Sequence, residues 1–233
     1  MRYNEIVEAS PNDTLISGTF YHGCPVEAKA EQIIQHGIQP QDASLKNQRP
    51  NGYMTPVKGR VYLTPQLQYA ICYALGGDYA GHQPSDSMLK YGGQYGYLFV
   101  IPGSELSDIQ PDEDSIGDFF YKNTKYTRGS NAITYNGVND NEIKTIWTFI
   151  FKNLTEKQRI KICQGEYAFY AQGGKRVVKN MPDWMKLKLI ELGSHIANEG
   201  GIIPSQVWKI DKRKSYDLKE DGSNFFDIAE RIK

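Results

Sequence analysis

The sequence predicts an α+β fold in which strands and helices mix without a regular repeat. Strand patterns are present around Phe20 and Val61 and over 95–101, and helical patterns recur from 142 onward. A doubly wound parallel sheet would require regular βαβ alternation, and the segments do not follow it. A length of 233 residues, 39% of them hydrophobic, suits one domain with insertions.

Two strand-to-helix units are expected in the first hundred residues. The first is a strand ending at Cys24, followed by a helix from Pro25 to His36 that Gly37 terminates. The second is a strand followed by a helix from Pro65 to Leu75. Threonine before proline is a favourable helix start, with the threonine as N-cap and the proline at the first helical position.

Two long segments, 38–59 and 76–94, are expected to be loops. Both are rich in glycine, and the first is also rich in proline. Loops of this length are commonly functional, so we expect both to line a ligand cleft and to become ordered around the ligand.

The second half of the chain is expected to be mainly helical. Helical periodicity covers 142–153, 155–163 and 182–198. We therefore predict a single domain over 1–233, with a mainly helical insertion around 142–198.

The segments around these helices are predicted to be less regular. Residues 122–141 have an irregular pattern, 202–210 indicate a strand interrupted by Pro204, and 211–233 indicate a charged, partly helical tail. Lys175 and Arg176 are expected in a solvated turn.

Composition excludes some classes of protein. The 27 basic and 27 acidic residues balance, which disfavours a globally basic nucleic-acid binder but not a local basic patch. The sequence has no apolar run of membrane-span length, and the N-terminus does not resemble a signal peptide. Three cysteines without metal-ligand spacing predict reduced thiols, a cytosolic protein and no metal site.

Two short segments suggest a ligand site. In Tyr21-His22-Gly23-Cys24, a histidine stands at a strand edge, and glycine allows a close backbone approach to a ligand. In Gly59-Arg60-Val61-Tyr62-Leu63-Thr64, a strand presents Tyr62 eleven residues before Tyr73. Two rings and a free amide suit a flat aromatic amide such as nicotinamide.

In this order and spacing, the two segments resemble the ADP-ribosyltransferase fold. The resemblance is closest to its His-Tyr-Glu branch, which includes diphtheria-type toxins and poly(ADP-ribose) polymerases. It covers about the first hundred residues and implies a split β-sheet core with helical insertions. It also implies that His22 bonds a ribose of NAD, that the backbone of Gly23 holds the nicotinamide amide, and that Tyr62 and Tyr73 stack on the nicotinamide.

The resemblance also requires a later glutamate beside the ribosyl cation that forms when NAD is cleaved. Glu199, before Gly200-Gly201-Ile202-Ile203-Pro204, fits best, because the family glutamate starts a strand late in the chain. Glu166 and Glu142 are the rivals. Ala197 stands where arginine-modifying members carry Glu or Gln, so arginine is disfavoured as the acceptor.

Other features leave alternatives open. Cys24 and Ala70 stand where many family members carry hydroxyl residues that face the amide, which would weaken NAD binding. His22 could instead be a structural histidine, and Tyr62 and Tyr73 could be core aromatics.

The resulting prediction is a cytosolic mono-ADP-ribosyltransferase, for which a toxin-like role follows only by analogy with the family. It would use NAD as co-substrate, with His22, Tyr62 and Glu199 as catalytic residues and a macromolecular acceptor, either protein or nucleic acid. The alternatives are a non-catalytic module that binds NAD or ADP-ribose and an enzyme resembling NAD-dependent RNA 2′-phosphotransferases. No membrane partner is expected, and the sequence does not predict an oligomeric state.

Overall fold

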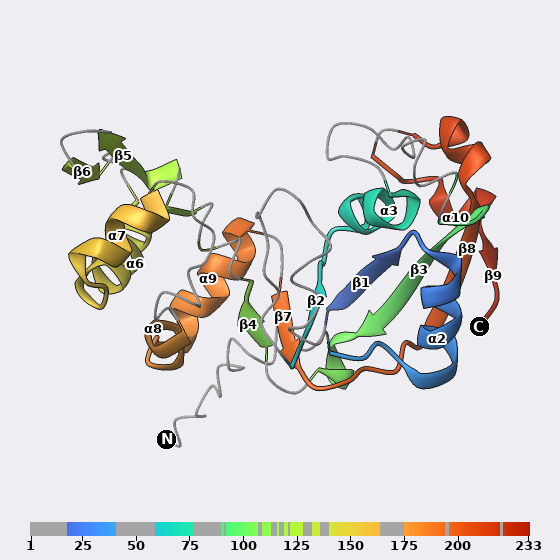
Figure 1. Ribbon diagram of the computed structural model, residues 1–233, viewed down its shortest axis with the longest axis horizontal. Coiled ribbons are helices and arrows are strands. Elements are labelled where there is room, and N and C mark those ends of the chain that lie inside the picture. The colour runs from blue at the N-terminus through green and yellow to red at the C-terminus, as the bar shows by residue number, and fades with distance from the viewer. Residues whose placement is uncertain are drawn as a thin grey trace, which may run out of the picture.

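The computed structural model combines antiparallel sheets with helices in an α+β architecture (Figure 1). It describes residues 18–40, 59–76, 90, 92–106, 109–112, 116, 119–120, 122–127, 132–135, 140–163, 175–193, 196–219 and 221–233. The strands are β1 (Thr19–Cys24), β2 (Arg60–Leu63), β3 (Tyr95–Pro102), β4 (Ile109–Pro111), β5 (Thr124–Thr127), β6 (Ala132–Tyr135), β7 (Ile196–Glu199), β8 (Gln206–Asp211) and β9 (Glu230–Arg231). The helices are α2 (Glu27–His36), α3 (Leu67–Leu75), α6 (Asn141–Lys152), α7 (Glu156–Cys163), α8 (Lys175–Lys179), α9 (Asp183–Gly193) and α10 (Phe225–Ile228), with 3₁₀ turns η2 (Gly103–Glu105) and η4 (Lys212–Asp217).

Two antiparallel sheets form the larger part of the molecule. One has the strand order β1-β3-β8-β9 and the other β2-β7-β4. They join where Tyr21 and Thr64 form a backbone bridge, with N···O distances of 2.8 and 3.0 Å. We call these strands with α2, α3, η2, η4 and α10 the sheet part.

Helix α3 lies unusually close to the first sheet. A Cβ on Gly23 would collide with the carbonyl oxygen of Ala70 and lie 2.5 Å from the amide nitrogen of Ala74. A Cβ on Gly96 of β3 would collide with the carbonyl of Ala74. Both alanines are fully buried. Small residues on both surfaces therefore allow the helix backbone to pack directly on β1 and β3.

A buried lysine ties the C-terminal segment to the start of α2. Lys212 in η4 is fully buried, and its Nζ donates to the carbonyls of Pro25 at 2.7 Å and Gly93 at 2.8 Å. Burial lowers the pKa of Lys212, and the nearby Glu27 carboxylate opposes that shift. Removal of this side chain would leave two carbonyls without their donor.

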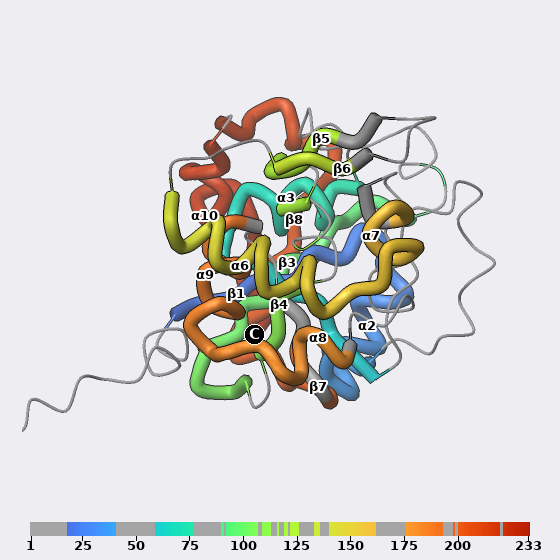
Figure 2. The backbone as a smooth tube through the Cα atoms, turned by 90° about the vertical axis from the view of Figure 1, so that its left-hand side faces the viewer, coloured from blue at the N-terminus to red at the C-terminus, as the bar shows by residue number. Residues whose placement is uncertain are grey.

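The remaining described residues form a second core, which we call the helical part. It comprises 116–123, the β5–β6 hairpin and α6–α9, and its buried side chains include Phe120, Ile146, Ile150 and Leu189. The chain enters after β4 and leaves before β7, and these strands pair with Pro111 opposite Ile196. The helical part is thus inserted between two paired strands. Its helices lie to one side of the sheets (Figure 1) and stand in front of them when that side faces the viewer (Figure 2).

Helix α9 connects the two cores. Leu189 packs into the core of the helical part, and the next residue, Ile190, packs into the core of the sheet part. Helix α9 also contacts β4. One helix therefore buries side chains on both sides of the junction.

Most predicted elements are confirmed near their expected ends. Helix α2 ends at Gly37 with φ of 76°, and α3 ends at Gly76 in the left-handed region. The predicted helix from Pro65 begins instead at Leu67, because Thr64 Oγ1 accepts the amide of Gln66 at 3.1 Å and holds an extended approach to the helix.

Four predictions for the second half were wrong. Residues 122–141 were expected to be irregular, but they include the β5–β6 hairpin. The third helix ends at Gly193, and 196–199 form β7, because strands β2 and β4 pair with this segment on both sides. Lys175 and Arg176 begin the short helix α8. The strand expected over 202–210 begins only at Gln206. The tail contains helical segments η4 and α10, as predicted, and also edge strand β9.

Candidate functional site

The junction of the two sheets brings His22 and Tyr62 together. His22 lies on β1, and its Nδ1 is 3.1 Å from the carbonyl oxygen of Tyr62 on β2. A carbonyl oxygen only accepts, so Nδ1 carries the proton and donates. The neutral ring then leaves Nε2 as a hydrogen-bond acceptor.

Burial favours this neutral form of His22. The pKa of His22 is lowered by burial, and the bond to the Tyr62 carbonyl opposes the shift. Phe99, opposite His22 in the β1–β3 register, has its ring centroid 6.2 Å from that of the imidazole. The imidazole is therefore oriented by a carbonyl and flanked by a buried ring.

Tyr62 lies on the face of β2 that points away from the core. Its neighbours Val61 and Leu63 are 2% and 3% exposed and belong to the core of the sheet part, whereas Tyr62 is half-buried. Side chains alternate between the two faces of a strand, so Tyr62 projects from the opposite face. This placement does not fit the alternative of a core aromatic.

Tyr73 lies on α3 beside Gly23. Its side chain is 39% exposed, and a Cβ on Gly23 would lie 2.8 Å from the Cβ of Tyr73. The predicted nicotinamide contacts Gly23 and Tyr73 are thus neighbours, and Gly23 follows His22, the predicted ribose contact, on β1. Glycine is also required at position 23 for a structural reason that the sequence did not indicate. The backbone of α3 lies so close to it that no side chain fits.

Glu199 ends the central strand of the second sheet. In the β2–β7 register Tyr62 pairs with Ala197 and Arg60 pairs with Glu199, so Glu199 is one same-face position away from the Tyr62 pair. The amide of Gly200 donates to the carbonyl of Gly59 at 3.2 Å and extends the pairing beyond the strand. The expectation that Glu199 starts a strand was wrong, because the strand that pairs with β2 and β4 begins at Ile196 and Glu199 is its last residue.

The two rival glutamates differ from Glu199. Glu142 lies in the first turn of α6, is exposed, and has its carboxylate 3.6 Å from Lys188 Nζ. Helix α6 lies in the helical part, away from β1 and β2 (Figure 1). Glu166 lies outside the described residues. Of the two candidate glutamates that the structure describes, Glu199 shares a sheet with Tyr62, and Glu142 does not.

Sequence reasoning missed Arg60 as a site residue. Arg60 is 4% exposed and lies on the same face of β2 as Tyr62, opposite Glu199 in register. The sequence did contain a signal. Arg60 stands two residues before Tyr62 in an expected strand, and side chains two residues apart lie on the same face. A buried arginine can orient a carboxylate or a phosphate.

Other predicted features have different outcomes. Most of the two expected cleft loops lies outside the described residues, although Ile38 is tied to Ile202 by backbone bonds of 2.7 and 3.0 Å. Cys24 and Cys72 are buried, and burial raises the pKa of both thiols. No group of three potential metal ligands lies among the residues that the structure describes.

The described helices are also too short or too polar to cross a membrane.

Comparison of the chain with models of protein families, with curated proteins and with solved structures finds no match.

Proposed function

We propose that the chain is a mono-ADP-ribosyltransferase that cleaves NAD at the junction of β1, β2 and β7. The observation that carries the proposal is the bond from His22 Nδ1 to the Tyr62 carbonyl, with Glu199 one same-face position further along the β2–β7 register. Three residues far apart in the chain, chosen for their chemistry, belong to neighbouring strands. Two antiparallel sheets joined by a single bridge also agree with the split β-sheet core that the resemblance implies.

The histidine would bind the ribose. Its Nδ1–H is engaged by the Tyr62 carbonyl, so Nε2 is the nitrogen that can accept a hydrogen bond from a ribose hydroxyl. The lowered pKa of His22 keeps this nitrogen unprotonated at neutral pH. A histidine with the opposite tautomer could not accept at the same position.

The nicotinamide would lie against Tyr62 and Tyr73. Both rings have exposed surface, and the backbone of Gly23 lies beside Tyr73. Aromatic stacking would hold the ring, and backbone groups of Gly23 would pair with its amide.

The reaction breaks the bond between ribose C1′ and the nicotinamide nitrogen. The bonding pair leaves with nicotinamide, which departs neutral, and the ribosyl group acquires oxocarbenium character. The Glu199 carboxylate would stabilise that positive charge. A nucleophilic atom of the acceptor then bonds to C1′ and loses its proton.

The buried cysteine thiols agree with the cytosolic setting that we expect.

Release of nicotinamide from NAD tests this proposal. His22→Asn keeps an amide donor near the position of Nδ1 but removes Nε2, so the fold should persist while NAD binding weakens. We expect roughly tenfold weaker binding, the size of one lost hydrogen bond in a polar site. His36→Asn, at the exposed end of α2, is the matched control and should behave as the wild type. Wild-type protein that binds NAD without releasing nicotinamide would instead indicate the binding module.

A further inference from the structure

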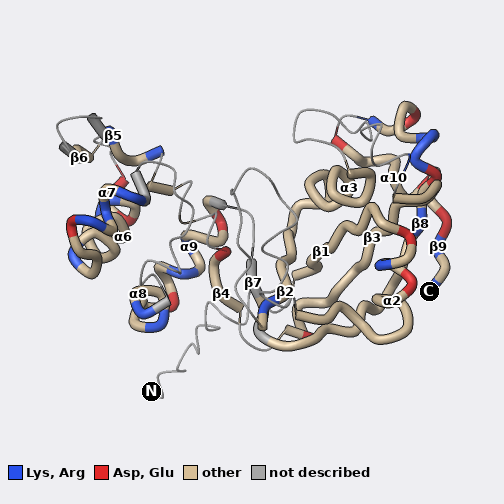
Figure 3. The backbone as a smooth tube through the Cα atoms, viewed as in Figure 1, with Lys and Arg blue, Asp and Glu red and all other residues tan. Residues whose placement is uncertain are grey.

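The charge of the chain is divided unequally between its two parts. Residues 116–193 hold thirteen Lys and Arg against seven Asp and Glu, whereas the rest holds fourteen against twenty. The balanced total therefore conceals a basic helical segment. Figure 3 shows the basic positions recurring along α6, α7, α8 and α9.

Several of these basic side chains have no acidic partner. Five are exposed and form no ion pair with any side chain that the structure describes: Lys144, Lys152, Lys157, Arg176 and Lys179. By contrast, Lys186 and Lys188 of α9 pair with Asp183, Glu142 and Glu191. Unpaired cations on one part of a neutral protein create a local positive potential.

Aromatic rings lie among these cations. Trp147 and Phe151 of α6 stack with centroids 4.4 Å apart and an angle of 18°. Tyr135 of β6 lies 5.0 Å from Trp147, and the Arg159 guanidinium lies 4.1 Å from the centroid of Phe151. All four side chains of this aromatic ladder are half-buried, so each keeps some exposed surface.

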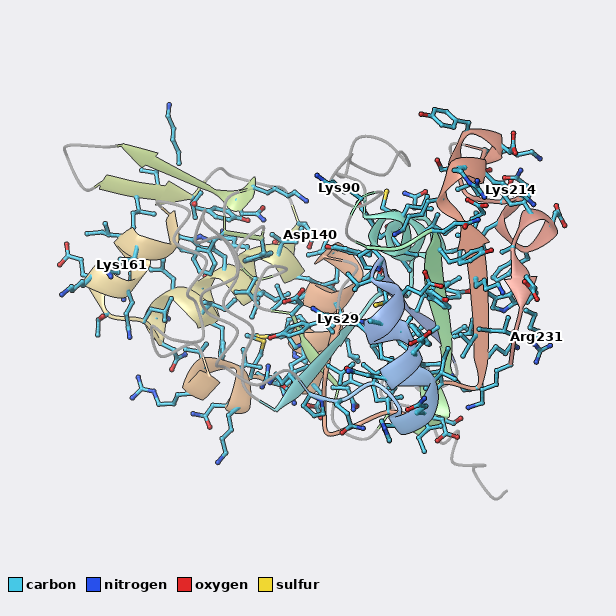
Figure 4. The ribbon with its side chains drawn as sticks, turned by 45° about the vertical axis from the view of Figure 1, so that its right-hand side comes forward. Lys29, Lys90, Asp140, Lys161, Lys214 and Arg231 are labelled. Atoms are coloured by element: carbon cyan, nitrogen blue, oxygen red, sulfur yellow. The ribbon has the colours of Figure 1, made fainter. Side chains whose placement is uncertain are left out.

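The ladder and three of the exposed cations, Lys144, Lys152 and Lys157, lie on the same two helices, α6 and α7. Residues three or four apart on a helix are neighbours, which places Lys144 beside Trp147. Arg159, whose guanidinium contacts the Phe151 ring, lies on α7, and this helix also carries Lys157. Lys161 of α7 and Arg231 of β9 lie at opposite ends of the molecule (Figure 4), so this surface is remote from the C-terminal edge of the first sheet.

We infer that the helical part binds single-stranded nucleic acid and that this is the class of acceptor. Phosphates would pair with the exposed lysines, and unstacked bases would contact the exposed surface of the ladder. A protein acceptor would not require aromatic rings interleaved with unpaired cations. The assignment of the acceptor rests on the proposed function, whereas the binding surface does not.

Fluorescence anisotropy with a labelled oligodeoxyuridine and a labelled oligouridine, which differ only in the sugar, tests the surface. The variant Lys144→Gln, Lys152→Gln, Lys157→Gln removes three cations at helical positions that tolerate glutamine. We expect roughly 10- to 100-fold weaker binding and a slope of log K against log salt that is shallower by about 2, since each single-strand phosphate contact contributes about 0.7. The control Lys29→Gln, Lys214→Gln, Lys219→Gln changes the net charge equally on exposed residues of the sheet part.

The outcomes separate the two proposals. Binding by the wild type and by the control, with loss in the helical variant, supports the inference, and a difference between the two oligonucleotides identifies the sugar. No binding at low salt, or equal loss in both variants, overturns it. Transfer of labelled ADP-ribose to protein but not to either oligonucleotide overturns the acceptor assignment. Oligonucleotide binding without nicotinamide release contradicts the proposed function alone.

Discussion

The sheet part and the helical part are stabilised in different ways. In the sheet part, backbone atoms meet directly, as where α3 packs on Gly23 and Gly96, and Lys212 joins two carbonyls. In the helical part, interdigitated side chains such as Ile146, Ile150 and Leu189 fill the core. Backbone contacts fix relative positions more narrowly than apolar side chains, which can repack. The comparison indicates that the proposed chemistry lies where geometry is fixed, and the proposed acceptor binding where the surface can vary.

The largest expected effect on this comparison is that of Gly23→Ala. The added Cβ meets the backbone of Ala70 and Ala74, which cannot move without displacing α3. We expect a loss of about 3 kcal/mol in the free energy of unfolding, measured by urea denaturation. Gly201→Ala is the control, because its Cβ would have 3.5 Å to the nearest atom. Equal stability of the two variants would contradict the direct backbone packing.

Lys212→Met should have the next largest effect. It preserves most of the volume but removes the donor that the carbonyls of Pro25 and Gly93 share. We expect a loss of about 2 kcal/mol in the free energy of unfolding, because buried acceptors are left without a partner. Lys214→Met, in the same 3₁₀ turn but exposed, should change little. A stability unchanged by Lys212→Met would remove this lysine from the account of the sheet part.

Tyr73→Ala tests whether the junction of the sheets holds the ligand. Loss of a stacking ring should weaken NAD binding by about 1.5 kcal/mol, or roughly tenfold in Kd, measured by calorimetry. Tyr73→Phe keeps the ring and should bind NAD as the wild type does. If the alanine variant binds equally well, Tyr73 does not contact the nicotinamide.

The smallest expected effect is the pH dependence that His22 contributes. Burial lowers its pKa, so the unfolded chain takes up the proton at a higher pH than the folded chain. Its stabilising contribution is therefore complete above the unfolded pKa of about 6.5 and is lost as the pH falls through the lower folded value. Thermal unfolding between about pH 7.5 and pH 5 should show a smaller loss for His22→Asn than for the wild type. Parallel curves would place His22 in a solvated position.

The sequence predicted those elements whose signals are local. Helices α2 and α3 end at Gly37 and Gly76, where a positive φ favours glycine, and β3 is a continuous apolar run. Strand β7 was missed because Ala197, Asn198 and Glu199 have low strand propensity. Its two partners, β2 and β4, are distant in the chain.

For the candidate site too, the residues with local signals were predicted, and the contacts between distant segments were not. Spacing and residue type indicated His22, Gly23, Tyr62 and Tyr73, and the structure places them around one junction. Local patterns carry no information on the bridge between Tyr21 and Thr64 or on the register that puts Glu199 opposite Arg60. Those depend on contacts between segments that are far apart in the chain, which single-sequence reasoning does not specify.

The central claim is that Glu199, at the junction of the sheets, stabilises the ribosyl cation, and nicotinamide release by two variants tests it most directly. Glu199→Gln keeps the side-chain size but removes the charge, whereas Glu142→Gln makes the same change at an exposed position of α6. The account predicts a rate about 10²–10³-fold lower for Glu199→Gln with an unchanged Kd for NAD, and a wild-type rate for Glu142→Gln. A wild-type rate for Glu199→Gln, or an equal loss in both variants, would contradict it.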